Sequence, residues 1–380
     1  MTLMALGDTA RFINGAAFKP SDWEESGLPI IRIQNLTGTG EKFNLTTRKV
    51  KPELIVEPGD LLVSWSATLD VYRWSGPRGV LNQHIFKVLP NADIDPEYLF
   101  YALKNALAEL SSKTHGSTMK HVVRGDFEST KVNVPPLPEQ RRIVDLLSRA
   151  EGIVRLRREA EKKAAELIPA LFLDMFGDPA TNPKGWPVAH LGEIICDGPQ
   201  NGLYKHASHY GDGTPILRID AFYDGRVTDL NALKRLRATP EEQAKFRLFS
   251  RNIVINRVNS PEYLGKSAII PALNEEMVFE SNMMRFATDE ALAIPEYVID
   301  VLQTSHAKSH FLSNAKHAIN QSSINQQDVK SLSVPLPPVD LQWAFAERKD
   351  DIFSIQSQQS TATAKAKATF DALLAQAFSA

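Results

Sequence analysis

The sequence is poor in cysteine, in net charge and in long apolar runs. Cys196 is the single cysteine among 380 residues, which excludes an internal disulfide framework and a cysteine-rich zinc site and favours a reducing compartment. No run approaches the roughly 18 apolar residues of a membrane-spanning helix, and the N-terminus lacks a basic start followed by an apolar stretch. We therefore expect a cytoplasmic protein without a membrane segment or a signal peptide.

The formal net charge of −2 excludes a polycation, so any contact with nucleic acid would depend on local patches. Common catalytic motifs are also missing: there is no G-x-x-x-x-G-K-[ST] phosphate loop, no G-x-G-x-x-G turn after a strand and no H-E-x-x-H pair. The histidines are isolated, and Cys196 has no evident histidine partner. The sequence therefore predicts no catalytic site, no metal and no cofactor in this chain.

The chain is long enough for two domains, and it contains an internal repeat. Hydrophobic residues make up 43% of it, enough for a sizeable core. Residues 126–140 (DFESTKVNVPPLPEQ) match residues 328–342 (DVKSLSVPLPPVDLQ), and the same offset of 202 relates Phe176 to Phe378. Upstream, the match continues at smaller offsets because the second copy carries extra residues between shared segments. Such insertions usually lie in surface loops, where function is common.

Each copy combines short apolar runs with helical stretches. Strand-like runs bounded by Gly, Pro and Asn cover 29–34, 61–65, 84–89, 215–219 and 252–257. Helical stretches cover 96–112 and 295–312. This mixture predicts an α+β fold and not a doubly wound sheet.

A long helix is predicted to follow each globular part. The order is a first globular domain at 1–138, a helix at 139–177, a second globular domain at 186–338 and a helix at 339–380. Gly177 would end the first helix. Apolar or small residues recur at three-four spacing in both helices, at Leu147, Ala150, Val154, Ala164, Ile168, Leu171 and Met175, and at Phe345, Ile352, Ala366, Phe370, Leu373 and Ala377. An antiparallel coiled coil would cover both stripes, whereas two separate solvated spacers are the alternative.

The tandem arrangement and its motifs resemble the specificity subunit of type I restriction–modification enzymes. The matching segments are VPPLPEQRRIVDLLSRAEGI (134–153), GDLLVS (59–64), LNQHIFKV (81–88), HGSTMKHV (115–122), INQSSINQQDVKSLSVPLPP (319–338) and FGDPATNPKGWPVAHLGEI (176–194). The second copy departs from the first at 340–342 (DLQ for PEQ) and at 320–322 (NQS for TMK). The second departure affects the loop that would read DNA.

The resemblance implies that both globular domains are target-recognition domains that read the two parts of a split, asymmetric double-stranded DNA target. The helices would act as spacer and as docking sites for methyltransferase subunits, with two copies expected. Whether a nuclease–translocase subunit also binds stays open. Catalysis, S-adenosylmethionine and ATP would belong to partner subunits, and this chain would be non-catalytic. The residues predicted to dock the partners are Gln140, Ile143, Leu147, Gln342, Phe345 and Ile352.

Candidate DNA contacts follow from side-chain chemistry. Arg and Lys suit guanine, Asn and Gln suit adenine, and Lys, Arg, Ser and Thr suit phosphate. In the first domain the candidates are Asn82, Gln83, His84, Lys113, His115, Ser117, Thr118, Lys120 and His121. In the second they are Lys205, His206, Asn256, Arg257, Asn259, Lys316, His317, Asn320, Gln321, Ser322 and Ser323. The loops at 113–121 and 316–323 are favoured because the repeat puts polar clusters at the same place, while a solvated turn is the alternative.

Three other functions are weighed against this one. A stand-alone DNA-binding module without restriction partners would need a basic surface, which the net charge of −2 disfavours. A coiled-coil scaffold would leave the polar loops unexplained. An enzyme with an unrecognised site would have to modify or cut DNA by itself.

Overall fold

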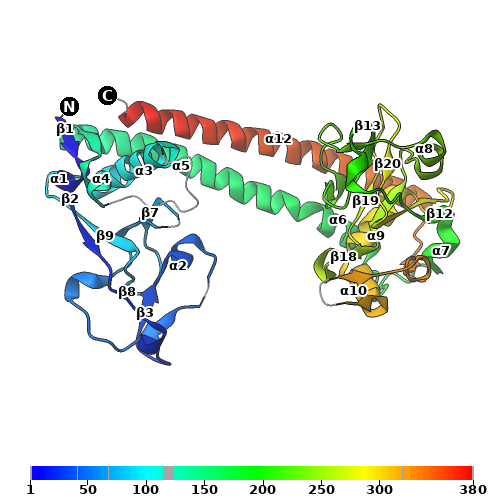
Figure 1. Ribbon diagram of the computed structural model, residues 1–380, viewed down its shortest axis with the longest axis horizontal. Helices are drawn as coiled ribbons and strands as arrows, with labels where there is room; N and C mark the ends of the chain where they lie inside the picture. The colour runs from blue at the N-terminus through cyan, green and yellow to red at the C-terminus, as the bar shows by residue number, and fades with distance from the viewer. Residues whose placement is uncertain (1, 41, 67, 114–123, 319–320, 379–380) are drawn as a thin grey trace. The chain divides into compact units, whose positions relative to one another are not determined.

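The computed structural model describes residues 2–40, 42–66, 68–113, 124–318 and 321–378 (Figure 1). The chain divides into two compact units, Met1–Ala160 with Gln359–Ala380, and Glu161–Gln358. Each unit holds one globular domain and a part of both long helices. The predicted α+β class, with two domains in tandem and long antiparallel helices, is confirmed.

The first unit is built from short strands around one long helix. Its elements are β1 (Thr2–Ala5), α1 (Leu6–Thr9), β2 (Ala10–Asn14), η1 (Pro20–Asp22), β3 (Leu28–Ile31), α2 (Ile33–Thr37), β4 (Asn44–Thr46), η2 (Pro52–Leu54), β5 (Ile55–Val56), β6 (Leu61–Ser64), β7 (Asp70–Arg73), β8 (Gly79–Leu81), β9 (Ile85–Pro90), α3 (Pro96–Lys113), α4 (Arg124–Ser129), β10 (Lys131–Val134) and the first part of α5 (Leu137–Ala165). The sheets have the orders β2-β9-β6-β7, β4-β3-β8-β5 and β1-β10.

The second unit repeats this plan with more strands. It contains α6 (Leu167–Phe176), β11 (Val188–His190), α7 (Leu191–Ile194), β12 (Ile195–Asn201), η3 (Ala207–His209), β13 (Tyr210–Leu217), β14 (Phe222–Tyr223), β15 (Gly225–Val227), β16 (Arg235–Leu236), α8 (Pro240–Phe246), β17 (Ile253–Asn256), β18 (Val258–Asn259), η4 (Pro261–Tyr263), β19 (Ser267–Ile269), β20 (Val278–Phe279), β21 (Met283–Thr288), α9 (Pro295–Gln303), α10 (Ser305–Asn314), β22 (Lys316–His317), β23 (Ser322–Ser323), α11 (Gln326–Lys330), β24 (Ser333–Pro335) and the first part of α12 (Val339–Phe378). The strand orders are β12-β21-β17-β19-β15-β14, β16-β13-β20, β11-β24 and β18-β23-β22.

Three predicted elements have different limits in the structure. The first long helix divides into α5 and α6 because Pro169 has no N–H to donate to the preceding turn. The predicted helix 295–312 divides at Thr304, whose hydroxyl accepts a hydrogen bond from the Ala307 N–H and caps α10. The predicted strand 29–34 ends at Ile31, where α2 follows.

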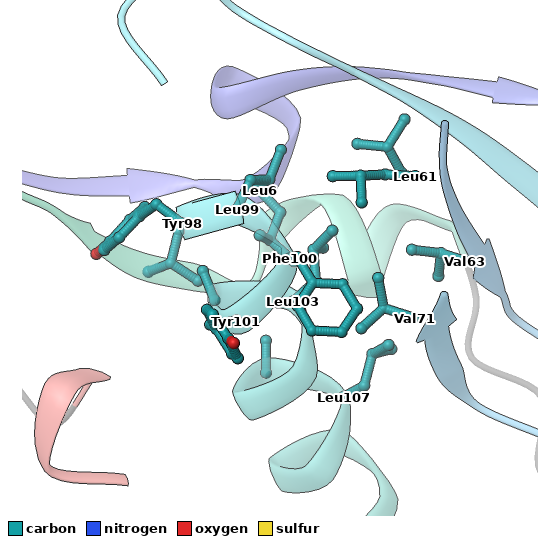
Figure 2. Packing of buried hydrophobic residues seen from close by; sticks show 14 of the residues in the cluster. Leu6, Leu61, Val63, Val71, Tyr98, Leu99, Phe100, Tyr101, Leu103 and Leu107 are labelled. Carbon is teal, nitrogen blue, oxygen red and sulfur yellow. The ribbon is translucent and has the colours of Figure 1, made fainter. Parts of the chain in front are cut away.

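Helix α3 carries the core of the first domain. Figure 2 shows Phe100, Leu103 and Leu107 of α3 beside Val63 of β6 and Val71 of β7. All of these side chains are almost completely buried. Full burial of one large apolar side chain stabilises a fold by about 1.5–3 kcal/mol, so this layer contributes strongly to the stability of the first domain.

A buried glutamine fastens each long helix to its own globular domain. The Gln342 amide N–H₂ donates to Leu292 O at 3.1 Å and to Pro337 O at 2.8 Å. Its oxygen accepts from the Ile294 N–H at 2.9 Å. Gln140 makes the same three contacts in the first unit, with Asp93 O, Pro135 O and the Asp95 N–H. The repeated motif thus places one amide where three backbone groups need a partner.

The tail of each repeat completes the hydrophobic core of the opposite domain. In the first unit, Phe378 of α12 packs on Tyr98 with ring centroids 5.3 Å apart. In the second, Phe176 of α6 packs on Tyr297 at 4.9 Å. Phe176 and Phe378 are the repeat partners identified in the sequence, so the two contacts are equivalent. Within each unit, parts of both long helices therefore share one core.

The predicted coiled-coil stripes are buried or half-buried: the half-buried members are Ala150, Leu171, Ile352, Ala366, Leu373 and Ala377. In the second unit the helices run antiparallel, since the Gln356 amide donates to Ala164 O at 2.6 Å and Arg348 approaches the sulfur of Met175. The predicted docking residues Gln140, Ile143, Leu147, Gln342 and Phe345 are buried in these intrachain contacts. Their burial gives them a role in packing within the chain, and the docking role predicted for these five stays a prediction. Ile352 is partly exposed and stays a prediction.

Replacing Gln342 with Ala should destabilise the second unit by about 2–4 kcal/mol, because one buried N–H and two buried carbonyls lose their partner. Urea unfolding followed by amide hydrogen exchange in α9 and α3 would measure this, with the larger loss of protection in α9. Gln358→Ala, at an exposed position of α12, is the control and should change stability by less than about 0.5 kcal/mol. Equal loss of protection from hydrogen exchange in both units would contradict the assignment of Gln342 to the second unit.

Candidate nucleic-acid interface

A small sheet in the second unit gathers several of the predicted DNA contacts. Strand β23 pairs with β18 and with β22, which sets Asn259 opposite Ser322 and Ser322 opposite His317. Lys316 and His317 are exposed, and the His317 Nδ1 lies 2.9 Å from the Ser322 hydroxyl. Gln321, which directly precedes β23, is exposed. The two sequence segments that were predicted separately therefore form one polar surface.

Arg257 lies at the edge of this surface, between β17 and β18. Its N–H donates to Asn282 O at 2.8 Å, and its O accepts from the Ile324 N–H at 2.9 Å. The guanidinium donates from one NH₂ group to Ser281 O at 3.1 Å. Three backbone segments thus fix the position of this half-buried cation.

A polar pocket of about 440 Å³ opens beside Arg257. It is lined by Asn201, Arg257, Asn325, Gln326, Gln327 and Lys330. Of these residues only Arg257 was predicted from the sequence. A sequence feature that could have indicated three of the others is the run of amides Asn325-Gln326-Gln327, which lies one residue after the predicted loop at 316–323. Asn201 gave no such signal, because it reaches the pocket from the distant strand β12.

The backbone at Ile219, in the same unit, is held by a buried carboxylate and a half-buried ammonium group. The Ile219 N–H donates to the Glu280 carboxylate at 2.6 Å, and the Lys266 ammonium donates to Ile219 O at 2.6 Å. Burial raises the pKa of Glu280 and lowers the pKa of Lys266 relative to their ordinary values. Lys266 also lies 3.9 Å from the Tyr223 ring centroid. The backbone around residue 219 is thus held from both sides.

Three predicted contacts are buried in the chain, and their role in reading DNA stays a prediction. Asn256 is fully buried in β17, and its amide donates only a long hydrogen bond to Tyr263 O at 3.4 Å. Ser322 is 1% exposed because its hydroxyl faces His317 inside the small sheet. Asn82 is 9% exposed and bridges the backbone at Ala16. In β17 and β23 the strand turns the side chain of Asn256 or Ser322 away from solvent, and Asn82 is covered beside the bridge to Ala16.

Two further predicted residues contact other parts of the second unit. The Lys205 ammonium pairs with the Glu242 carboxylate of α8 at 2.8 Å, and its side chain is mostly buried. His206 precedes η3 and its Nδ1 lies 3.0 Å from the Ser208 hydroxyl. Neither residue joins the pocket or the small sheet through these contacts.

The first domain has different chemistry at the equivalent place. Trp65 donates its backbone N–H to His84 O, as Arg257 does to Asn282 O. The Trp65 ring stacks on Phe86 at 5.8 Å, and the Gln83 amide nitrogen lies 3.1 Å from His84 Nε2. An aromatic ring in the first domain thus replaces a guanidinium in the second.

The other first-domain candidates are not described by the structure. His115, Ser117, Thr118, Lys120 and His121 lie outside the described residues, as does Asn320 of the second domain. Lys113 ends α3, and its side chain is not described. Their roles stay predictions.

Within the described ranges, no group of three or more His, Cys, Asp or Glu side chains could hold a metal ion. No helix among these same residues is both long and apolar enough to span a bilayer.

The sequence is similar to specificity subunits of type I restriction enzymes. Residues 1–166 match the family described as the type I restriction modification DNA specificity domain. The chain is 24% identical to the EcoBI specificity subunit of Escherichia coli, over 99% of this chain and 85% of that protein. It is 27% identical to the MjaVIII specificity subunit of Methanocaldococcus jannaschii, over 96% of this chain and 89% of that protein.

Solved structures share the fold. One solved chain comes from a study of the complex assembly and conformational transition of a type I restriction–modification system. It superposes with a TM-score of 0.65 at 18% sequence identity, and the match covers 99% of this chain and 97% of the solved chain. The S subunit of the type I system of M. genitalium gives 0.53 at 13% identity, covering 100% and 96%. The comparisons confirm the resemblance: the chain is related to DNA specificity subunits. The similarity is to the specificity subunits of type I restriction–modification systems in particular.

Replacing Asn256 with Leu should leave the selected DNA sequence unchanged and alter the free energy of unfolding by less than about 1 kcal/mol. The reason is that its buried Oδ1 has no hydrogen-bond partner among the described residues, so little is lost. Asn259→Leu is the matched control, because Asn259 lies in the polar sheet and should alter the selected sequence. Selection of bound sequences from a random pool measures both. A changed sequence with Asn256→Leu at unchanged stability would reinstate Asn256 as a reader.

Proposed function

We propose that this chain reads a split, asymmetric DNA target for a type I restriction–modification enzyme, one part with each domain. The observation that carries the proposal is the repeated scaffold with different side chains at equivalent places, Trp65 in the first domain and Arg257 in the second. A guanidinium and an aromatic ring favour different base edges and backbone groups. Two similar domains would therefore select different half-sites.

The chain is proposed to act without catalysis of its own. Its relatives are named as specificity subunits, which supports a reading role rather than a reacting one. Methyl transfer from S-adenosylmethionine, and any ATP-driven cleavage, would then be carried out by partner subunits. A net charge of −2 suits a chain that shares phosphate neutralisation with such partners.

Exposed apolar side chains on the long helices support partner docking. Ile153 of α5 is 51% exposed and Ile355 of α12 is 48% exposed. The two positions are related by the repeat offset of 202. An exposed β-branched side chain on a helix gains stability when a partner covers it. One methyltransferase subunit on each helix would account for both.

The proposed reading function is tested by co-expressing the chain with its methyltransferase and mapping methylated adenines in the host genome. The expected result is one motif with two different specified parts separated by unspecified bases. A truncated chain without the second domain should lose the motif. A symmetric or continuous motif would contradict the assignment of one half-site to each domain.

Ile153→Asp together with Ile355→Asp should abolish stable binding of the methyltransferase, and either change alone should reduce two bound copies to one, because each carboxylate would be buried unpaired. Size-exclusion chromatography with mass determination measures the copies. Ser360→Asp is the control, since it lies at an exposed position on another side of α12. Two bound copies with the double variant would place the docking site elsewhere.

A further inference from the structure

The pocket beside Arg257 contains side-chain amides that the protein itself does not use. Asn201, Gln326 and Gln327 line it, and their side-chain amides make no hydrogen bond to any described residue. A free carboxamide presents a donor and an acceptor side by side. Three of them in one pocket form a surface that can exchange paired hydrogen bonds with a ligand.

Rigid elements hold these amides in place. Asn325 caps α11 by accepting from the Gln327 and Asp328 N–H groups at 2.7 and 3.2 Å, and its own N–H donates to the Asp328 carboxylate at 2.7 Å. His310 of α10 lies 2.9 Å from Asp328 O, which ties α11 to its neighbour. These contacts fix the backbone from which Gln326 and Gln327 extend, so both amides start from a defined place beside the pocket.

Asn201 is held equally firmly on the other wall. The next residue, Gly202, donates its N–H to Met283 O at 3.1 Å. A Cβ at Gly202 would lie 2.2 Å from Glu280 O, so only glycine allows this close approach. The end of β12 is thereby pressed against the turn before β21, and Asn201 faces the same pocket as α11.

The charge of the pocket favours an electron-rich ligand. Arg257 and Lys330 contribute positive charge, and no carboxylate is among the lining residues. Arg257 already donates to Ser281 O, and its Nε is buried without a partner among the described residues. Arg257 therefore offers one side of its guanidinium to a ligand and not a bidentate pair of donors. Both cations suit phosphate oxygens, which leaves base recognition to the amides.

In the first domain, the equivalent side chains bind other groups of the chain. At the repeat offset of 202, Gln326 and Lys330 correspond to Arg124 and Glu128. These two residues form an ion pair at 2.9 Å, and Arg124 also donates to Phe12 O at 3.1 Å. Side chains that bind each other are less available to a ligand. The free amides are thus a property of the second domain.

We propose that this pocket selects adenine in the half-site read by the second domain. Adenine presents N7 as an acceptor and N6–H₂ as a donor in the major groove, and a carboxamide matches both atoms at once. Gln326 and Gln327 make this contact from the start of α11, Asn201 approaches from the opposite wall, and Lys330 and Arg257 hold the adjoining phosphate. The assignment rests on the proposed function, since it requires that the second domain reads DNA.

The test compares sequences selected by the complete complex with its methyltransferase. Gln326→Ala and Gln327→Ala should lower discrimination for adenine at a specified position by roughly 5- to 150-fold, the effect of one lost bidentate contact. The other half-site should be unchanged. Alanine favours helices, so α11 should persist. Asn231→Ala, an exposed amide of the same unit outside the pocket, should change nothing.

Two conservative variants separate base contact from phosphate contact. Gln326→Glu and Gln327→Glu keep the size but replace the donor by an acceptor, so preference should move from adenine toward cytosine, whose N4–H₂ is a donor. Lys330→Gln should weaken binding to all sequences alike and reduce the salt slope by about one. A Gln variant that behaves like Lys330→Gln would assign the amides to phosphate and overturn the proposal.

Failure of the two proposals can be told apart. If the unaltered complex selects no DNA sequence, the proposed function fails. If it selects a split motif whose adenines respond to none of the pocket variants, or whose change falls in the half-site of the first domain, the proposed function stands and the adenine pocket is wrong.

Discussion

A buried glutamine at the start of each long helix is the contact on which the rest of the structure depends. Gln140 and Gln342 each satisfy three backbone groups of their own domain. A buried backbone group without a partner costs about 1–3 kcal/mol, so the amide fixes where the helix begins and in which direction it leaves. The apolar stripe of each helix therefore begins at a fixed place in its domain.

The two domains combine one scaffold with two chemistries. The paired strands at their bases have the same register, with Met4 opposite Val132 and Ala189 opposite Val334. The polar ends of the sheets differ because the scaffold does not depend on them. An aromatic ring or a cation can follow the same strand without disturbing the core. This separation allows the polar side chains to change while the core and the long helices stay the same.

The candidate site was partly predictable. The sequence indicated the loop at 316–323, because a polar cluster recurred at the repeat position, and it indicated Arg257 and Asn259, because polar side chains follow a predicted strand there. It also included Asn256, which the structure buries. Residue type alone does not reveal which side of a short strand faces solvent. Asn201 was missed for the opposite reason, since a single asparagine far away in sequence gives no local signal.

The sequence by itself determined the repeat and the two long helices with their apolar stripes, because these depend on periodicity along the chain. Only the tertiary structure decided which polar side chains stay free. The pocket joins β12, Arg257 between β17 and β18, and α11, whose residues meet through sheet pairing and through backbone contacts such as Gly202 with Met283. Whether an amide such as Gln326 binds its own chain or a ligand depends on these distant neighbours, and no local pattern encodes them.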